Sequence, residues 1–197
     1  MFFRKKSGPV DFLAVGLGNP GKEYANTRHN AGQIAVSALA ADAGVQLTRA
    51  KFKSLTAEAT FDGVRVLLML PQTYMNLSGQ AVAEAAKFYK IPPERVLVFS
   101  DDVALDVGKV RVRRKGSDGG QKGLRNITEQ LGTTEFPRIR LGVGAKPHPE
   151  MEMADWVPSR FHSDERKSID EAAANAVAAA KLVFAGDIDG AMNRYSR

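Results

Sequence analysis

Hydrophobic and polar positions alternate along this chain with two periods, one typical of strands and the other of helices. Short apolar runs are followed by segments in which apolar residues recur every three or four positions. The patterns predict strands at 12–17, 55–61, 64–70, 96–99, 107–113 and 139–143, and helices at 30–43, 79–90, 122–131 and 163–185. Strands that alternate with helices indicate an α/β fold, in which helices cover both faces of one sheet.

Residues that turn or end a chain separate these elements. Asp62-Gly63 lies between two expected strands and favours a tight hairpin, so those strands should pair antiparallel. Pro92-Pro93 and Gly132 each follow a helix, as is typical of helix ends. We therefore expect a mixed, mostly parallel β-sheet. The last helix carries an apolar stripe that fits core packing: Ile169, Ala173, Ala176, Ala180 and Phe184.

Length and composition are those of an ordinary single-domain globular protein. The chain has 197 residues, 44% hydrophobic and 25% charged, with no repeat or low-complexity linker. We expect one domain over 11–197 after a short tail over 1–10, whose residue order does not suit a secretory signal. No apolar run approaches the ~18 residues of a membrane span. The absence of cysteine excludes disulfides, thiolate metal sites and a cysteine nucleophile, and it fits a cytoplasmic protein.

The charge balance is basic. A net charge of +6 and a pI of about 9.6 favour an anionic partner, nucleic acid first. Composition alone fits a basic solvated surface equally well. Residues 109–115, KVRVRRK, sharpen the prediction, because five of the seven are basic and two Val alternate with the charges at strand period. One face of that strand should be strongly positive.

A glycine pattern after the first strand resembles a dinucleotide-binding loop. Gly16, Gly18 and Gly21 satisfy G-x-G-x-x-G. In dinucleotide folds the third glycine opens a helix that holds pyrophosphate, whereas here a turn-rich polar segment follows. Asp42 has the right spacing for a ribose contact but lies in the tail of a helix. We therefore expect no nucleotide cofactor, and we expect the glycines to bend the backbone so that Asn19 projects from the strand end.

One of the three histidines, His29, is the candidate for chemistry. His148 and His162 lie in polar or proline-flanked stretches and are expected to be solvated. Taken alone, His29 would more often cap a helix or satisfy a loop than act in catalysis. Its position after the first strand changes this interpretation, because ligands of open α/β sheets bind outside the carboxyl ends of the strands.

Three separate segments bring polar side chains to that edge. They are Asn19 and His29, then Tyr74, Met75 and Asn76 after the strand ending at Leu70, and Asp101 and Asp102 after the strand ending near Ser100. A carboxylate beside an imidazole fixes its tautomer and stabilises the imidazolium, so the pair can act as a general base. No cysteine or G-x-S-x-G serine offers a nucleophile, which leaves water, and side-chain amides can bind the developing oxyanion. The sequence contains no metal-site motif.

Three long blocks resemble the signature sequences of the bacterial peptidyl-tRNA hydrolase family. They are VGLGNPGKEYANTRHNAG at 15–32, PQTYMNLSG at 71–79 and GSDGGQKGLRNI at 116–127. Their order and spacing match the family, and FSDDVAL at 99–105 falls at its acidic segment. The resemblance implies hydrolysis of the ester between peptide and tRNA, which recycles tRNA from stalled ribosomes. It also implies a monomeric, cytoplasmic enzyme without cofactor or metal.

The resemblance further implies roles for individual residues. His29 matches the catalytic base, Asp101 the acid that holds it, and Asn19 the residue that selects substrates with a blocked amino group. Candidate substrate contacts are Tyr24, Tyr74, Met75, Asn76 and Lys122, and candidate clamps for the 5′-phosphate at the tRNA acceptor end are Arg113 and Arg140.

The chain also departs from the family pattern. Lys122 stands where an Asn is usual, Gln121 where a His is frequent, and Ala104 where an acid is usual. A Lys cannot accept a hydrogen bond but can meet a phosphate. Residues 146–156 predict a mobile flap beside the cleft. Two other functions stay open: an RNA-binding relative without hydrolytic activity, and a nucleotide-dependent oxidoreductase.

Overall fold

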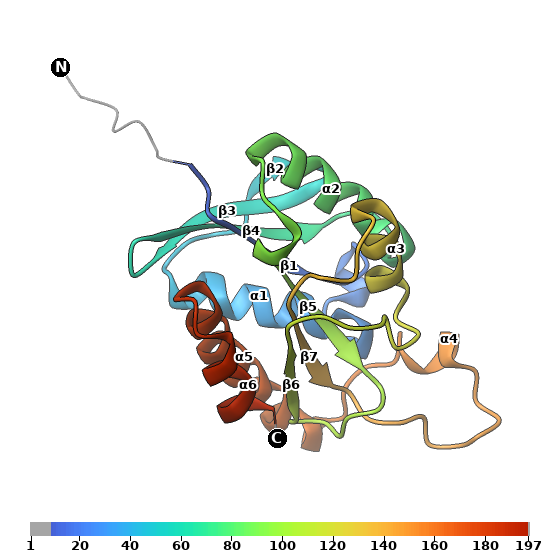
Figure 1. Ribbon diagram of the computed structural model, residues 1–197. Helices are drawn as coiled ribbons and strands as arrows, with labels where there is room; N and C mark the ends of the chain where they lie inside the picture. The colour runs from blue at the N-terminus through green and yellow to red at the C-terminus, as the bar shows by residue number, and fades with distance from the viewer. Residues whose placement is uncertain (1–8, 197) are drawn as a thin grey trace.

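A seven-stranded sheet with the order β2-β3-β4-β1-β5-β7-β6 forms the centre of the fold (Figure 1). The computed structural model describes residues 9–196. The strands are β1 (Phe12–Gly16), β2 (Arg49–Lys51), β3 (Ser54–Phe61), β4 (Val64–Pro71), β5 (Val96–Asp102), β6 (Val110–Arg113) and β7 (Arg138–Gly142). Five strands share one direction, and β3 and β6 oppose them. The predicted mixed, mostly parallel α/β sheet is therefore confirmed.

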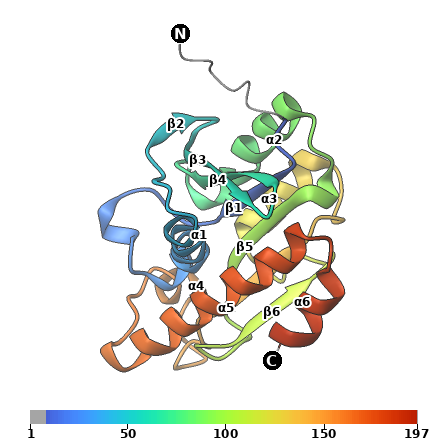
Figure 2. The ribbon, with the colours of Figure 1, turned by 90° about the vertical axis from the view of Figure 1, so that its left-hand side faces the viewer.

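Helices cover both faces of the sheet, as predicted (Figure 2). They are α1 (Ala31–Asp42), α2 (Ser78–Tyr89), α3 (Lys122–Leu131), α4 (Met153–Trp156), α5 (Arg166–Phe184) and α6 (Ile188–Tyr195). Helices α1, α5 and α6 pack on one face, and α2 and α3 pack on the other. The predicted stripe of α5 is buried there, which confirms core packing.

The parallel centre of the sheet decides where the site lies. β1 pairs with β4 on one side and β5 on the other, and β5 pairs with β7, all in parallel. The carboxyl ends of these four strands therefore meet at one edge. Gly16 and Gly32 let β1 and α1 approach closely there: a Cβ on Gly16 would lie 2.6 Å from the Gly32 carbonyl oxygen, and one on Gly32 would lie 2.2 Å from that of Phe99.

Several boundaries differ from the sequence prediction. β5 continues to Asp102, so Asp101 lies within the strand and not after it. The last long helix begins at Arg166, after a single turn of 3₁₀ helix at Ser163–Glu165. β2, α4 and α6 were not predicted, because a strand of three residues and helices of four and eight residues are too short to show a clear period of their own kind.

The predicted tail at 1–10 falls mostly outside the described residues, which begin at residue 9. Val10 is buried in the core that α2 and α3 cover, so the packed part of the chain already includes it. Among residues 9–196, no helix combines the length and apolar character that crossing a membrane requires.

Candidate active site

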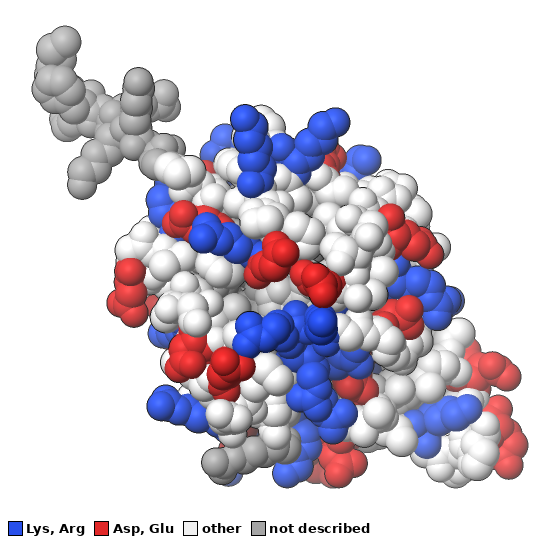
Figure 3. All heavy atoms as spheres, in the orientation of Figure 1, with Lys and Arg blue, Asp and Glu red and all other residues white. Residues whose placement is uncertain are grey.

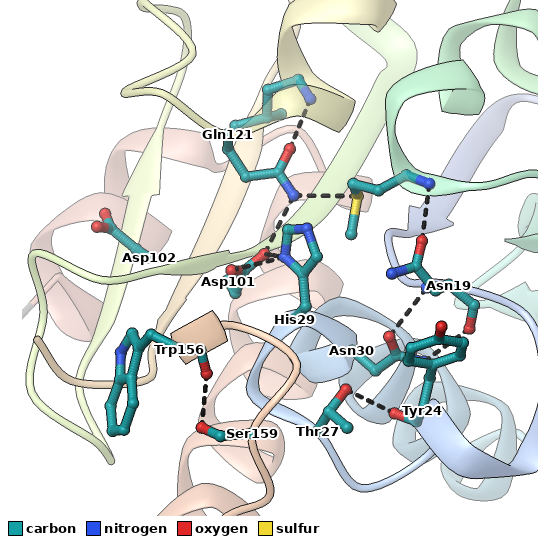
Figure 4. A network of polar contacts seen from close by, with 12 residues as sticks. Asn19, Tyr24, Thr27, His29, Asn30, Asp101, Asp102, Gln121, Trp156 and Ser159 are labelled. Atoms are coloured by element: carbon teal, nitrogen blue, oxygen red, sulfur yellow. Dashed lines mark hydrogen bonds and ion pairs between the residues drawn. The ribbon is translucent and has the colours of Figure 1, made fainter. Parts of the chain in front are cut away.

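The loop between β1 and α1 carries Asn19 and His29 and is closed by Asn30. The Asn30 side chain accepts a hydrogen bond from the Asn19 backbone N–H at 2.9 Å and donates one to the Asn19 carbonyl at 3.0 Å (Figure 4). A side chain that satisfies both backbone groups of another residue holds the loop as a ring. Asn19 and His29 thus come to the same sheet edge, as the sequence predicted.

His29 is hydrogen-bonded to Asp101 through one ring nitrogen. His29 Nδ1 lies 3.1 and 3.0 Å from the two carboxylate oxygens of Asp101, and the His29 backbone N–H donates to the Val157 carbonyl at 2.8 Å. The Asp101 side chain is 2% exposed and that of His29 is 13% exposed. Because a carboxylate accepts the Nδ1 proton, Nε2 is left as the basic nitrogen, and it has no hydrogen bond to any described residue.

Gln121 is the second partner of Asp101. Its side-chain oxygen accepts from the Leu124 N–H at 2.8 Å and so caps the N-terminus of α3. The amide nitrogen must then point the other way, where it donates to Asp101 Oδ1 and approaches Met75 Sδ, each at 3.1 Å. The helix cap therefore determines which end of Gln121 faces the carboxylate.

Asn19 links the loop to the segment after β4. Its side-chain oxygen accepts from the Met75 N–H at 2.9 Å. The two N–H groups of its amide have no hydrogen-bond partner among residues 9–196, so they are available to a ligand. Met75 is buried, whereas Tyr74, 64% exposed, and Asn76 flank it at the surface. Tyr24 is half-buried in the Asn19 loop.

A cleft of about 270 Å³ opens beside His29. The predicted residues His29, Asp101, Lys122 and Arg140 all line it, together with Met153 and Val157. Lys122 is the first residue of α3 and is exposed. The structure thus brings the imidazole, its carboxylate and two cations to one cavity, whereas Asn19 is not among the residues that line it.

A larger cavity of about 520 Å³ lies at the other edge of the sheet, beside Phe12 and Phe184. It contains no histidine. Two of its cations are already paired with carboxylates, Arg114 with Asp189 at 2.7 Å and Lys115 with Glu135 at 3.4 Å. The chemistry therefore points to the smaller cleft.

Four arginines from two strands form what we call the arginine wall: Arg111, Arg113, Arg138 and Arg140. The antiparallel register places Arg111 opposite Arg140 and Arg113 opposite Arg138, so all four lie on one face of the sheet. Figure 3 shows Lys and Arg gathered in a band over β6 and β7. The predicted positive face of the basic strand is thereby confirmed, and β7 adds to it.

The proximity of like charges is visible in the pKa values of the wall. Burial, then Arg111 and Arg140, lower the pKa of Arg113. Burial and then Arg140 lower the pKa of Arg138 to about 10, which leaves it cationic at neutral pH. Within the described chain only Arg140 of the wall has a carboxylate within 4 Å, Asp102 at 3.6 Å, while the more distant charge of Asp118 raises the pKa of Arg138. The wall therefore carries unneutralised positive charge that an anion could stabilise.

Arg28, which the sequence did not single out, precedes His29 and anchors the loop that carries it. Its fully buried guanidinium donates to both oxygens of Glu165, at 3.1 and 2.8 Å, and to the Val143 carbonyl at 2.9 Å. It also lies 4.0 Å from the centroid of the Trp156 ring. The sequence did not indicate that Arg28 is buried, because Arg is rarely buried unless it is paired and its partner Glu165 is distant in the sequence.

The segment predicted as a mobile flap lies beside the cleft, but its end is anchored. Residues 153–156 form α4, and buried Trp156 donates its ring N–H to the Gly144 carbonyl at 2.9 Å. Arg28 packs on this ring and pairs with Glu165, so it joins the segment to the His29 loop. The apolar Trp156 at the end of an acidic stretch is the sequence signal that could have revealed this anchor.

Comparison with known proteins agrees with the sequence blocks. The family model described as peptidyl-tRNA hydrolase matches residues 13–197. The chain belongs to the peptidyl-tRNA hydrolase family. This confirms the resemblance seen in the sequence. Within the described residues, no group of three or more His, Asp or Glu is arranged to hold a metal ion.

Individual members of the peptidyl-tRNA hydrolase family match almost end to end. The peptidyl-tRNA hydrolase of Caldanaerobacter subterraneus is 46% identical over 185 residues, 94% of this chain and 99% of that protein. The one of Chloroflexus aggregans is 48% identical over 94% of this chain and 98% of its own. The crystal structure from Acinetobacter baumannii superposes with a TM-score of 0.89 at 38% identity, covering 94% of each chain.

Proposed function

We propose that this protein hydrolyses the ester bond between the peptide, or N-acyl-aminoacyl group, and tRNA in peptidyl-tRNA, and so recycles tRNA released from stalled ribosomes. The observation that carries the proposal is the buried His29–Asp101 pair with a free Nε2 at the cleft. The full-length relatives named peptidyl-tRNA hydrolase support it. Their names do not favour the RNA-binding relative or the oxidoreductase as alternatives.

In the proposed reaction, His29 Nε2 takes a proton from water as the water oxygen attacks the ester carbonyl carbon. Asp101 accepts the Nδ1–H and stabilises the imidazolium that forms. The tetrahedral intermediate then collapses, the bond to the ribose oxygen breaks, and that oxygen takes the proton back from His29. Gln121 holds Asp101 in place by its own hydrogen bond.

Asn19 reads the acyl side of the substrate in this proposal. Its oxygen is engaged by the Met75 N–H, so its free amide N–H groups can donate to a peptide carbonyl. A free aminoacyl group has no such carbonyl, which explains a preference for blocked substrates. Tyr24, Tyr74, Met75 and Asn76 would contact the rest of the acyl chain from the same edge.

The phosphates of the tRNA would bind to the cations beside the cleft. Arg113 and Arg140 of the arginine wall would clamp the 5′-phosphate at the acceptor end, and Lys122 would meet a neighbouring phosphate at the mouth of the cleft. Contacts of this kind read backbone and shape and not sequence. We further propose a monomer, because one chain supplies every group used above, and a cytoplasmic location, which the family resemblance implies and the absence of cysteine fits.

Two substrates test the proposal. The protein is incubated with N-acetyl-aminoacyl-tRNA and with free aminoacyl-tRNA, with and without EDTA, and release of the acyl group is measured. We expect selective cleavage of the blocked substrate. In Asn19→Ala the selectivity should fall while some hydrolysis remains. Tight tRNA binding with no cleavage of either substrate would favour the RNA-binding alternative.

A further inference from the structure

A second basic surface lies at the end of α2 that points away from the cleft. Five cations lie next to Phe88 at the end of α2 or on the β2–β3 hairpin that contacts it, and we call them with Phe88 the α2-end patch: Arg49, Lys51, Lys53, Lys87 and Lys90. Figure 3 shows Lys and Arg standing out over this end of the molecule. None of the five forms an ion pair with Asp or Glu in the described chain.

Phe88 forms a fixed and open aromatic platform within this patch. It is 62% exposed, which makes it the most exposed Phe of the described residues. The ring contacts Phe52 at 5.3 Å and Tyr89 at 4.9 Å between centroids. Lys51 Nζ lies 4.4 Å from the Phe88 centroid and 3.2 Å from the Tyr89 hydroxyl. The exposed side of the Phe88 ring is free, while the contacts with Phe52, Tyr89 and Lys51 hold the ring in place.

The backbone beneath the platform is unusual. Phe52 and Lys53 form the turn between β2 and β3 with φ values of 52° and 50°, a conformation that Gly and Asn normally supply. This turn buries the Phe52 ring against Phe88, and Lys51 and Lys53 flank Phe52 in the sequence. Side chains are kept at positions where glycine would be less strained, as is typical of functional sites.

We propose that the α2-end patch binds RNA, with an unpaired base stacked on Phe88 and the neighbouring phosphates against the lysines. Unpaired cations around one exposed aromatic ring are the combination that single-stranded nucleic acid requires. Phe88 is the only large exposed hydrophobic residue of the patch, so little apolar area is available for a membrane or a protein core. The inference goes beyond the proposed function, since α2 places about 18 Å between the patch and the catalytic edge.

Fluorescence anisotropy with a labelled oligouridine of about ten nucleotides tests the proposal. The full chain carries Arg113→Ala and Arg140→Ala, so that cleft binding contributes little. We expect Phe88→Ala and Phe88→Leu to weaken binding roughly tenfold, and Phe88→Trp to retain it. Lys87→Ala with Lys90→Ala should reduce the salt slope by about 1.4. The matched control is Lys167→Ala with Lys181→Ala on α5, which should change neither.

Two outcomes would overturn the proposal. One is equal affinity of Phe88→Ala and the parent for the oligouridine. The other is binding of anionic phospholipid vesicles, or of blunt RNA duplex, as tightly as the single strand. Because no ester cleavage is read, failure here leaves the proposed hydrolysis untouched. Conversely, Phe88→Ala should keep the wild-type rate on a short N-acetyl-aminoacyl minihelix.

Discussion

The His29–Asp101 pair and the arginine wall are neighbours, because Asp101 lies on β5 and the wall on β7 and β6, but their charges are paired differently. Next to His29, two charged groups are paired: Asp101 faces the imidazole, and Glu165 pairs with Arg28. Within the described wall, like charges face each other, and only Arg140 has a carboxylate within 4 Å. An ion pair fixes the relative positions of its two side chains, whereas an unpaired positive charge attracts an anion. The first region is therefore suited to chemistry and the second to binding.

The largest expected effect comes from removing the imidazole. His29→Ala should lower kcat by about 10²–10⁴-fold, because the general base is lost while the phosphate contacts remain. The rate is measured on N-acetyl-aminoacyl-tRNA, and the affinity on intact tRNA should hold. His148→Ala, at an exposed position, is the control and should behave like wild type. Full activity of His29→Ala would contradict the proposed role of His29 as the general base.

The next largest loss of kcat is expected when the carboxylate partner of His29, Asp101, is replaced by a neutral amide. Asp101→Asn can donate to Nδ1 and so leave the proton on Nε2, the wrong tautomer for a base, and we expect a loss of about 10²-fold. Both kcat and the ¹⁵N shifts of His29 report this change. Asp102→Asn is the matched control, since Asp102 contacts Arg140 and not His29. Equal losses in the two variants would contradict the tautomer argument.

Changes in the arginine wall should alter binding and leave the chemical step intact. Arg113→Ala or Arg140→Ala should raise KM about tenfold and reduce the salt slope of tRNA binding by about 1 each. Folding stability should hold or rise, because a like charge is removed. Arg114→Ala, which loses only an exposed pair with Asp189, is the control. A change in kcat without a change in KM would argue against a phosphate clamp.

The last prediction concerns the Arg28–Glu165 ion pair, where the expected effect is on stability and not on activity. Burial raises the pKa of Glu165, but hydrogen bonds from Arg28 and the His162 backbone outweigh it, so this pKa lies below its ordinary 4.5. The pair therefore stabilises the fold above pH 4.5, and this contribution is lost as pH falls through the lowered value. Glu165→Gln should cost about 1–3 kcal/mol near neutral pH and much less near pH 3.

Denaturant unfolding at both pH values measures this difference between wild type and variant. Lys167→Ala removes one charge of a long, exposed pair at 4.0 Å and serves as the control, with no expected change. A stability difference that is the same at both pH values would show that the carboxylate charge of Glu165 is not what Arg28 needs.

The α/β class, the main helices and the central strands could be read from the sequence, since each has a period over at least one full element. The candidate residues could be read too, because Asn19 and His29 follow one strand and Asp101 lies next to the end of another. The three-residue strand β2 and the helix α4, which is barely one turn long, could not. Packing, and not local pattern, selects elements of that length.

The sequence by itself determined the chemistry available at the strand ends, because hydrophobic periods and strand order alone bring those residues to one edge. Only the tertiary structure decided how that chemistry is held. The cap of α3 orients Gln121 toward Asp101, and Glu165, 137 positions from Arg28, neutralises it. Such contacts form only when segments distant in the sequence come together in space, and local patterns of polarity do not show which segments will do so.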